Sequence, residues 1–338
     1  MAGMKYNKIL PRLFRLLSKF PVLIAEFFIS LFGKKVRISF INWGDVSFGF
    51  FIEPMKKSLA PHNLSCKIVK CYSPHISFFS SLGNGEKIKK SKSKLKIFYT
   101  GENVNNDPYI KYKGNCIEFA NLSLGFDFIL SDNYLRFPLW LLYYFKPFDT
   151  KDDISAVLKR IGCSRPKTKF CSMVASHDKS GIRTKMYNDV SKVNNVDCPG
   201  KLLHNDDSLH NIYNNNKHLY LQKYKFNICP ENSISPGYVT EKLFHSLSAG
   251  CIPIYNGWSK NPEPDIVNPG VILWYDALDV VNNERTIARI QSLNSNDNEY
   301  NTFIKQPFFC DTAVDKIHQI LQQYLAKLQS VVDSAFGK

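Results

Sequence analysis

Apolar and polar residues follow a strand, loop, helix, strand pattern between Tyr224 and Gly257. Residues 226–229 and 251–255 are short apolar runs of the kind that form buried strands. Between them, apolar residues recur at helical spacing from about Val239, which predicts a helix with one buried face. Gly250 is a natural residue to follow this helix, because glycine adopts the left-handed conformation that ends helices. The polar residues gather in the loop before the helix.

Similar strand and helix patterns extend over the rest of the chain. Residues 36–44 and 95–103 each predict a strand followed by a glycine-containing loop. Alternating strands and helices indicate an α/β fold, and 338 residues are enough for two domains of about 150 residues each. The other predicted elements are strands at residues 67–73, 169–178 and 271–275, and helices at residues 154–161, 286–293 and 311–328 and from about Gly181.

A polar, basic stretch divides the chain near its middle. Residues 149–169 contain Arg165 and Pro166 and predict a connection between two domains that includes one short helix. The expected organisation is an N-terminal segment (residues 1–35), a first α/β domain (36–165), a second α/β domain (166–310) and a C-terminal helix (311–338).

The N-terminal segment is basic and apolar. Eight lysines and arginines within residues 1–37 are accompanied by a single acid, Glu26. Its apolar part, residues 20–33, is too short for a transmembrane helix, which needs about 20 residues, and no small-residue cleavage site suggests a signal peptide. Such a segment fits a helix that lies in an anionic membrane interface. An ordinary surface helix with a solvated basic face is the alternative.

The whole chain is basic, with 44 Lys+Arg against 29 Asp+Glu and a formal net charge of +15. This excess indicates an anionic partner, which can be nucleic acid, anionic lipid or a phosphorylated substrate. Zinc-finger spacings and RNA-binding aromatic motifs are missing from the sequence, so we do not expect nucleic acid. The nine cysteines are scattered without a C-x-x-C pair, which favours thiols in a reducing compartment. Six lysines in residues 87–96 predict a solvated loop or a contact for an anionic acceptor.

The start of the central helix carries the first candidate chemistry. A helix N-terminus offers unpaired N–H groups and a positive dipole, and Lys242 adds a full charge there. This combination suits a diphosphate, and Glu241 beside it can accept hydrogen bonds from sugar hydroxyls. Taken alone, the same residues also fit a structural role in which Thr240 caps the helix and Glu241 favours its first turn.

Two other charged residues lie where strands or helices present side chains to a ligand. Glu102 follows the strand predicted at residues 95–103, and ligands of open α/β sheets bind at the carboxyl ends of strands. Arg183 lies in the first turn of the helix that begins near Gly181, where its guanidinium can fork onto phosphate oxygens. A turn glutamate and a surface arginine are the structural alternatives.

Longer motifs favour the functional interpretation of these residues over the structural one. The run from Phe226 through Cys229 and Glu231-Asn232 to GYVTEK (residues 237–242) and then PIYNG (253–257) resembles the donor-binding motif of the α-1,3/4-fucosyltransferases, glycosyltransferase family 10. In the first half, FYTGEN (98–103), SLGFD (123–127) and NYLRFPLWLLYY (133–144) resemble the acceptor domain of that family, in the same order. Pro230 and Asn256 depart from the family, which commonly has an aromatic residue and a tryptophan there.

The resemblance implies a GT-B-like fold, in which two Rossmann-like domains face a central cleft. It implies that residues 36–165 form the acceptor-binding domain and residues 166–310 the nucleotide-sugar-binding domain. It implies that Glu102 is the general base and that Arg183 and Lys242 bind the diphosphate. It also implies that Glu241 holds ribose hydroxyls, while Asn232 and Tyr238 shape the pocket for base and ribose. By analogy with other two-Rossmann glycosyltransferases, the C-terminal helix packs back toward the first domain. The expected donor-binding residues are Arg183, Asn232, Tyr238, Val239, Thr240, Glu241 and Lys242.

The resemblance further implies transfer of L-fucose from GDP-L-fucose, with inversion, to a hydroxyl of a glycan acceptor. The expected linkage is α-1,3 to a sugar of the N-acetylglucosamine or glucose type, in an oligosaccharide or a lipopolysaccharide O-antigen. We expect no required cofactor, because the chain has no Asp-x-Asp motif to hold a metal and has two cations for the diphosphate; Mn²⁺ or Mg²⁺ is expected at most to stimulate.

Three points stay open in the sequence. The departures at Pro230 and Asn256 leave a different nucleotide-activated deoxysugar as an alternative donor. A non-catalytic protein that binds anionic membranes or lipopolysaccharide is a second alternative. The expected location is the cytoplasmic face of a bacterial membrane, reached through residues 1–35, with a Golgi membrane as the alternative.

Overall fold

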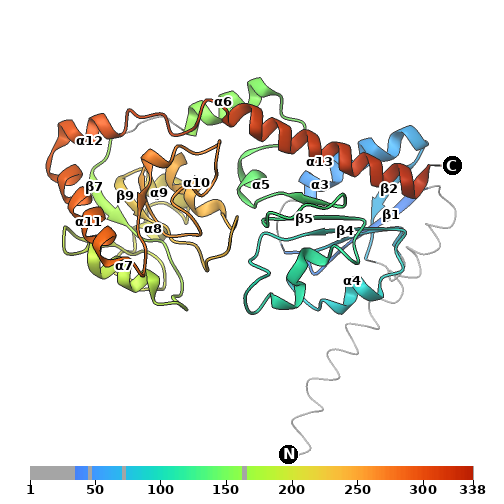
Figure 1. Cartoon of the computed structure of the whole chain (residues 1–338), viewed down its shortest axis with the longest axis horizontal. Coiled ribbons are helices and arrows are strands. Elements are labelled where there is room, and N and C mark those ends of the chain that lie inside the picture. Colours follow the sequence, from blue (N-terminus) through green and yellow to red (C-terminus); the bar gives the residue numbers. More distant parts are fainter. Residues whose placement is uncertain (1–34, 45–47, 71–73, 162–165, 338) are drawn as a thin grey trace, which may run out of the picture.

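The computed structural model describes residues 35–44, 48–70, 74–161 and 166–337, arranged as two α/β lobes (Figure 1). The first lobe is built on a six-stranded sheet of order β2-β1-β3-β4-β5-β6, and the second on a five-stranded sheet of order β11-β10-β9-β7-β8. Neighbouring strands pair in parallel in both sheets. The predicted α/β class with two parallel sheets is therefore confirmed.

The strands of the first sheet are β1 (Lys35–Ile41), β2 (Ser65–Ile68), β3 (Ile76–Phe79), β4 (Leu95–Tyr99), β5 (Leu122–Gly125) and β6 (Tyr134–Arg136). Those of the second are β7 (Lys169–Ser172), β8 (Val196–Asp197), β9 (Tyr224–Ile228), β10 (Ile252–Tyr255) and β11 (Leu273–Trp274). The central strands are buried on both faces, as parallel strands covered by helices are.

The helices of the first half are α3 (Phe48–Leu59), α4 (Glu86–Lys90), α5 (Trp140–Tyr144) and α6 (Lys151–Ile161). Those of the second are α7 (Ile182–Val190), α8 (Ser208–Asn211), α9 (Lys217–Leu221), α10 (Glu241–Ser248), α11 (Val280–Ser295) and α12 (Asp297–Phe303). Three 3₁₀ turns lie at Ala60–His62, Ile110–Cys116 and Pro269–Val271.

The last helix, α13 (Ala313–Phe336), returns to the first lobe and packs against α3, α6 and strands β4 to β6 (Figure 1). Its residues Ile317, Leu321, Tyr324, Leu328 and Val332 recur at helical spacing and are fully buried. They share one hydrophobic core with the first sheet. The first lobe is therefore completed by the end of the chain.

Some elements differ from the sequence-based predictions. The strand β3 and the helix α3 were not predicted, because β3 has only four residues, one of which is Ser77, and α3 contains an internal proline, Pro54. The central helix begins at Glu241, two residues later than predicted, because Thr240 is still extended. The lysine-rich residues 87–96 were predicted as a solvated loop, but they include most of α4, where only Ile88 is buried. Residues 149–169 were predicted as a connection, and their helix α6 packs against α10 and α13.

Two predictions fall partly on residues that the structure does not describe. The strand predicted at residues 67–73 overlaps β2, but residues 71–73 lie outside the described part of the chain. The predicted membrane-interface segment, residues 1–35, lies outside it except for Lys35. In the described residues, every helix is too short or too polar to cross a bilayer.

A buried ion pair joins the two lobes. Arg136 of β6 forms a bidentate ion pair with Glu263, with nitrogen–oxygen distances of 3.0 and 2.9 Å. Trp140 Nε1 donates a hydrogen bond to the same carboxylate at 2.7 Å. Arg136 Nη2 also donates to the carbonyl of Gly237 at 2.9 Å. The loop before α10 is therefore held by a residue of the first lobe.

Candidate functional site

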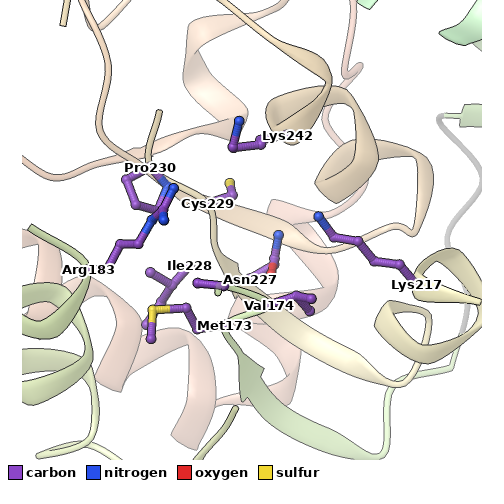
Figure 2. A pocket seen from close by; sticks show the side chains of 10 residues that line it. Met173, Val174, Arg183, Lys217, Asn227, Ile228, Cys229, Pro230 and Lys242 are labelled. Atoms are coloured by element: carbon purple, nitrogen blue, oxygen red, sulfur yellow. The ribbon is translucent and has the colours of Figure 1, made fainter. Parts of the chain in front are cut away.

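The carboxyl ends of β7 and β9, together with α7, α9 and α10, surround a small pocket. Three cationic side chains line it, Arg183, Lys217 and Lys242, and we call it the cationic pocket. Figure 2 shows the ammonium groups of Lys217 and Lys242 and the guanidinium of Arg183 approaching the same space from three sides. Its remaining walls are largely apolar and include Met173, Val174, Ile228 and Pro230.

The loop that carries the motif is organised by a buried carboxylate, Glu231, which is 2% exposed. Its side chain accepts hydrogen bonds from the backbone N–H of Thr240 at 2.8 Å, from the Thr240 hydroxyl at 2.7 Å and from the Tyr255 hydroxyl at 3.2 Å. The Thr240 hydroxyl is thus used by Glu231, and it makes no capping hydrogen bond to α10. The structural alternative in which Thr240 caps the helix through its side chain is therefore wrong.

Three oxygen atoms surround the ammonium group of Lys242 at the start of α10. Its Nζ lies 2.9 Å from the Thr240 hydroxyl, 3.5 Å from Glu231 Oε2 and 3.7 Å from Glu241 Oε1. Burial opposes its charge, but Glu231 and Glu241 outweigh burial and raise the pKa of Lys242. Conversely, although burial works against it, the charge of Lys242 lowers the pKa of Glu241. Both groups are therefore charged at neutral pH.

Arg183 reaches the pocket from the first turn of α7. Asp178 accepts hydrogen bonds from the backbone N–H groups of Arg183 and Thr184, at 3.3 and 2.8 Å, and thereby caps the helix. The guanidinium donates to Asn232 Oδ1 at 2.7 Å and to the carbonyl of His177. Asn232 therefore positions Arg183 in this structure.

Tyr238 and Val239, the other predicted donor-binding residues, are buried between the lobes, at 2% and 1% exposure. The ring of Tyr238 packs edge-on against Phe126 of the first lobe at 4.9 Å. Gly237 before it has a positive φ of 80°, and a Cβ there would lie 2.5 Å from the carbonyl oxygen of Phe126. This position therefore requires glycine.

Glu102 lies in the loop that follows β4 in the first lobe. Burial raises its pKa, the charge of Lys242 lowers it, and Glu241 and Glu231 raise it. These influences mean that the carboxylate of Glu102 lies near the charges of Lys242, Glu241 and Glu231. The next residue, Asn103, donates to the Ser233 hydroxyl at 2.8 Å, so the loop of Glu102 is bonded directly to the donor-side loop.

A second, wider hollow lies between α5, α6, α9 and α10. Its lining is aromatic and hydrogen-bonding, with Tyr143, Tyr144, His218, His245 and Ser248 among its residues. Burial and the nearby charge of Lys217 lower the pKa of His245 to about 4, so this imidazole is neutral at pH 7. Arg160 and Ile161 also line the hollow, so its surface combines aromatic rings with neutral and cationic polar groups.

Sequence reasoning missed two residues of this site. Glu231 was used only as part of the resemblance, although an acid next to an asparagine in a glycine-containing loop is a recognisable signal for a buried hydrogen-bond acceptor. Lys217 was not considered at all, because α9 is five residues long and has no recognisable motif. Only the fold brings Lys217 to the pocket.

The chain has two α/β lobes, each built on a parallel sheet, and a cationic pocket lies at the strand ends of the second lobe. These features define a GT-B-like fold. Among solved structures, a crystal structure of an α1,3-fucosyltransferase is similar with a TM-score of 0.59 and 23% sequence identity, over 88% of this chain and 92% of that one. A crystal structure of an α1,3-fucosyltransferase with GDP-fucose is similar with a TM-score of 0.58, also at 23% identity, over 86% and 90% of the two chains. These likenesses establish the fold.

Two domain models give the family. Residues 164–325 match the model of the glycosyltransferase family 10 (fucosyltransferase) C-terminal domain, and residues 38–143 match that of the α-(1,3)-fucosyltransferase FucT N-terminal domain. The chain belongs to glycosyltransferase family 10, the fucosyltransferases, as its motifs predicted.

Curated relatives agree with this assignment. The α-(1,3)-fucosyltransferase FucT of Helicobacter pylori is 28% identical over 254 residues, which are 66% of this chain and 49% of that protein. The α-(1,3)-fucosyltransferase B of Drosophila melanogaster is 30% identical over 130 residues, which are 33% of this chain and 29% of that protein. The matched part of the chain thus spans about half or less of the length of these relatives.

Proposed function

We propose that this protein is an inverting fucosyltransferase that moves L-fucose from GDP-L-fucose to a hydroxyl group of a glycan. The observation that carries the proposal is the shared pocket of Arg183 and Lys242, with Glu102 of the other lobe near the charge of Lys242. Membership of glycosyltransferase family 10 supports the donor, and the names of the relatives support α-1,3 linkage.

In the proposed reaction, the acceptor oxygen attacks the anomeric carbon from the side opposite the phosphate. A carbon–oxygen bond forms to the acceptor while the bond to the β-phosphate oxygen breaks, and the electron pair leaves with GDP. The acceptor hydroxyl loses its proton to the carboxylate of Glu102, which acts as general base. The raised pKa of Glu102 strengthens it as a proton acceptor relative to an exposed glutamate.

The departing diphosphate gains negative charge as the bond breaks. Arg183, Lys242 and the N–H groups at the start of α10 supply fixed positive charge for it, which favours the transition state over the bound substrate. In this proposal Glu241 holds ribose hydroxyls, Asn232 orients Arg183 beside the nucleotide, and the Tyr238–Val239–Thr240 segment forms the wall from which α10 begins.

We propose that the reaction requires no metal ion or other cofactor. The proposal is supported by the protein cations that line the pocket. They can neutralise the charge of a diphosphate, which is what a metal ion does in other enzymes. Added Mn²⁺ or Mg²⁺ is expected only to stimulate.

The proposed acceptor is an oligosaccharide or a lipopolysaccharide glycan that carries a sugar of the N-acetylglucosamine or glucose type. The wide hollow lined by Tyr143, Tyr144 and His245 supports an extended saccharide, because tyrosine offers both an apolar ring face and a hydroxyl. Glu102 lies near this hollow, since its charge, like those of Glu241 and Lys242, acts on the pKa of Tyr143.

The proposed location is the cytoplasmic face of a bacterial membrane, with a Golgi membrane as the alternative. The basic, apolar residues 1–35 support attachment to anionic lipid. Deleting residues 1–33 should abolish co-sedimentation with vesicles that contain phosphatidylglycerol, while transfer to a soluble glycan continues. If the truncated protein sediments with the vesicles as the full chain does, the segment is not the anchor.

The test of the proposed function is a titration with GDP, UDP and CDP, followed by transfer assays with a panel of nucleotide sugars. Selective binding of GDP and transfer from GDP-L-fucose support the proposal. Transfer from a different GDP-deoxysugar would favour the second candidate, the same reaction with another donor, for which the specific observation is that Pro230 lines the cationic pocket. Vesicle or lipopolysaccharide binding without any nucleotide binding would indicate a non-catalytic protein.

A further inference from the structure

Among the three cations of the cationic pocket, Lys217 is the one whose charged group has no hydrogen bond or ion pair within the described part of the chain. Lys242 is held by Glu231 and Thr240, and Arg183 by Asn232 and the His177 carbonyl. The ammonium of Lys217 makes neither a hydrogen bond nor an ion pair with any described residue, although it points into the pocket (Figure 2).

An ammonium that lines a pocket beside two other cations is unfavourable without a counter-ion. Burial lowers the pKa of Lys217, and the neighbouring charges of Lys242 and Arg183 lower it further, while Glu241 and Cys229 act in the opposite direction. Lys242 is in the reverse position, because nearby carboxylates raise its pKa. Lys217 thus feels the charge of Glu241, but it has no direct ion-pair contact with a described carboxylate, whereas Lys242 has two.

The backbone that carries Lys217 is fixed. Asn216 precedes α9 and its side chain accepts from the backbone N–H of Leu219 at 3.0 Å. One turn further, Tyr220 is buried and its hydroxyl donates to Asp206 at 2.7 Å and accepts from Tyr224 at 2.8 Å. The base of the Lys217 side chain is thus held in place, and only its flexible stem remains to adjust to a ligand.

From this arrangement we infer that Lys217 binds the nucleotide diphosphate directly and is the third phosphate-binding cation of this enzyme. The inference rests on the proposed function, since it takes the ligand of the pocket to be a nucleoside diphosphate. It also distinguishes the three cations by what holds each of them. Arg183 and Lys242 are held in place by the protein before the donor arrives, whereas Lys217 obtains its counter-ion only from the donor.

The experiment is a calorimetric titration of the full chain and its Lys217→Met variant with GDP and with guanosine. Methionine keeps the apolar stem and removes the charge. Loss of a charge-assisted hydrogen bond should weaken GDP binding about 10- to 100-fold. Guanosine has no phosphate, so its affinity should be unchanged. A substitution that merely disturbed the pocket would weaken both ligands.

The matched control is Lys223→Met, which removes the same charge from an exposed position in the same segment. It should change GDP affinity less than twofold, which excludes an effect of net charge. The melting temperatures of both variants should match that of the parent protein, and the Lys217→Arg variant, which keeps the charge, should recover part of the lost affinity if the first variant proves unstable.

Each outcome has a distinct meaning. If the parent binds GDP and Lys217→Met binds it equally well, the inference is overturned while the proposed function stands. If Lys217→Met loses affinity for guanosine as strongly as for GDP, Lys217 has a structural role and the inference is again wrong. If the parent binds neither GDP nor pyrophosphate, the proposed function and the inference both fail.

Discussion

The two sides of the site differ in how far the protein organises them before any ligand is bound. On the donor side, Lys242, Thr240, Tyr255 and the start of α10 converge on the buried carboxylate of Glu231. On the acceptor side, the Thr100 hydroxyl bonds the backbone of Glu102, whose carboxylate makes no hydrogen bond with any described residue.

This difference matches the demands of the proposed reaction. A diphosphate has fixed charge and shape, so preorganised cations bind it with little rearrangement. A general base must instead be able to form a new hydrogen bond with the incoming hydroxyl, and a carboxylate already engaged elsewhere cannot do so. We therefore expect substitutions on the donor side to affect binding, and substitutions at Glu102 to affect the chemical step.

The sharpest test of this contrast is Glu102→Gln, which keeps the shape of the side chain and removes its basicity. Turnover should fall about 10²- to 10⁴-fold, the usual contribution of a general base. GDP affinity should stay the same, because the substitution leaves the phosphate cations in place. Glu118→Gln, an exposed acid of the same lobe, is the control. Near-normal turnover of Glu102→Gln would assign the base to another residue.

The next largest effect is expected at Lys242. Lys242→Ala should weaken GDP binding by about 1.5–3 kcal/mol, the worth of a charge-assisted hydrogen bond. Lys305→Ala, which removes an exposed charge from the same lobe, should leave the affinity unchanged in the same calorimetric titration. Equal GDP affinity in Lys242→Ala and the parent protein would remove Lys242 from the phosphate site. It would also contradict the expectation that substitutions on the donor side affect binding.

A smaller effect links the two sides through charge. Because burial raises the pKa of Glu102, the rate should begin to fall on the acid side at a higher pH than for an ordinary glutamate, by about tenfold for each further pH unit. The charge of Lys242 lowers this pKa, so Lys242→Met should shift the acid limb to higher pH. The pH profile of kcat/KM for the acceptor measures both. An acid limb that does not move in the variant would mean that the two groups do not interact.

The smallest expected effect is that of metal removal. Since protein cations surround the proposed diphosphate site, EDTA should lower the transfer rate only modestly. The check is an assay in EDTA with and without excess Mn²⁺. A complete loss of activity that Mn²⁺ restores would show that a metal carries charge that we assign to Arg183 and Lys242.

The elements that the sequence predicted well are those whose pattern arises locally. The apolar spacing of α13 and the paired apolar runs of β9 and β10 can be read from consecutive residues, and Gly250 follows α10 with a left-handed φ of 71° as predicted. The strand β3 was missed because its four residues, three apolar and one serine, are too few to distinguish a strand from other buried segments.

The candidate site shows the same limit more clearly. Motif residues such as Glu241 and Lys242 are recognisable because they are adjacent in the chain. Lys217 comes close to the other pocket residues, and Glu102 to the charges around Lys242, only through the order of the strands in each sheet and the joining of the lobes. No local pattern of residues encodes that order. The ion pair of Arg136 with Glu263 is likewise a product of residues 127 positions apart.

The return of α13 to the first lobe has a consequence for the making of the protein. When residues 36–165 leave the ribosome, the surface that Ile317, Leu321 and Tyr324 will cover is still open to water. That half can bury its hydrophobic surface only after the last residues of the chain have been synthesised. A nascent chain that stops before residue 313 therefore exposes a long apolar groove, and such chains are natural clients for chaperones and proteases.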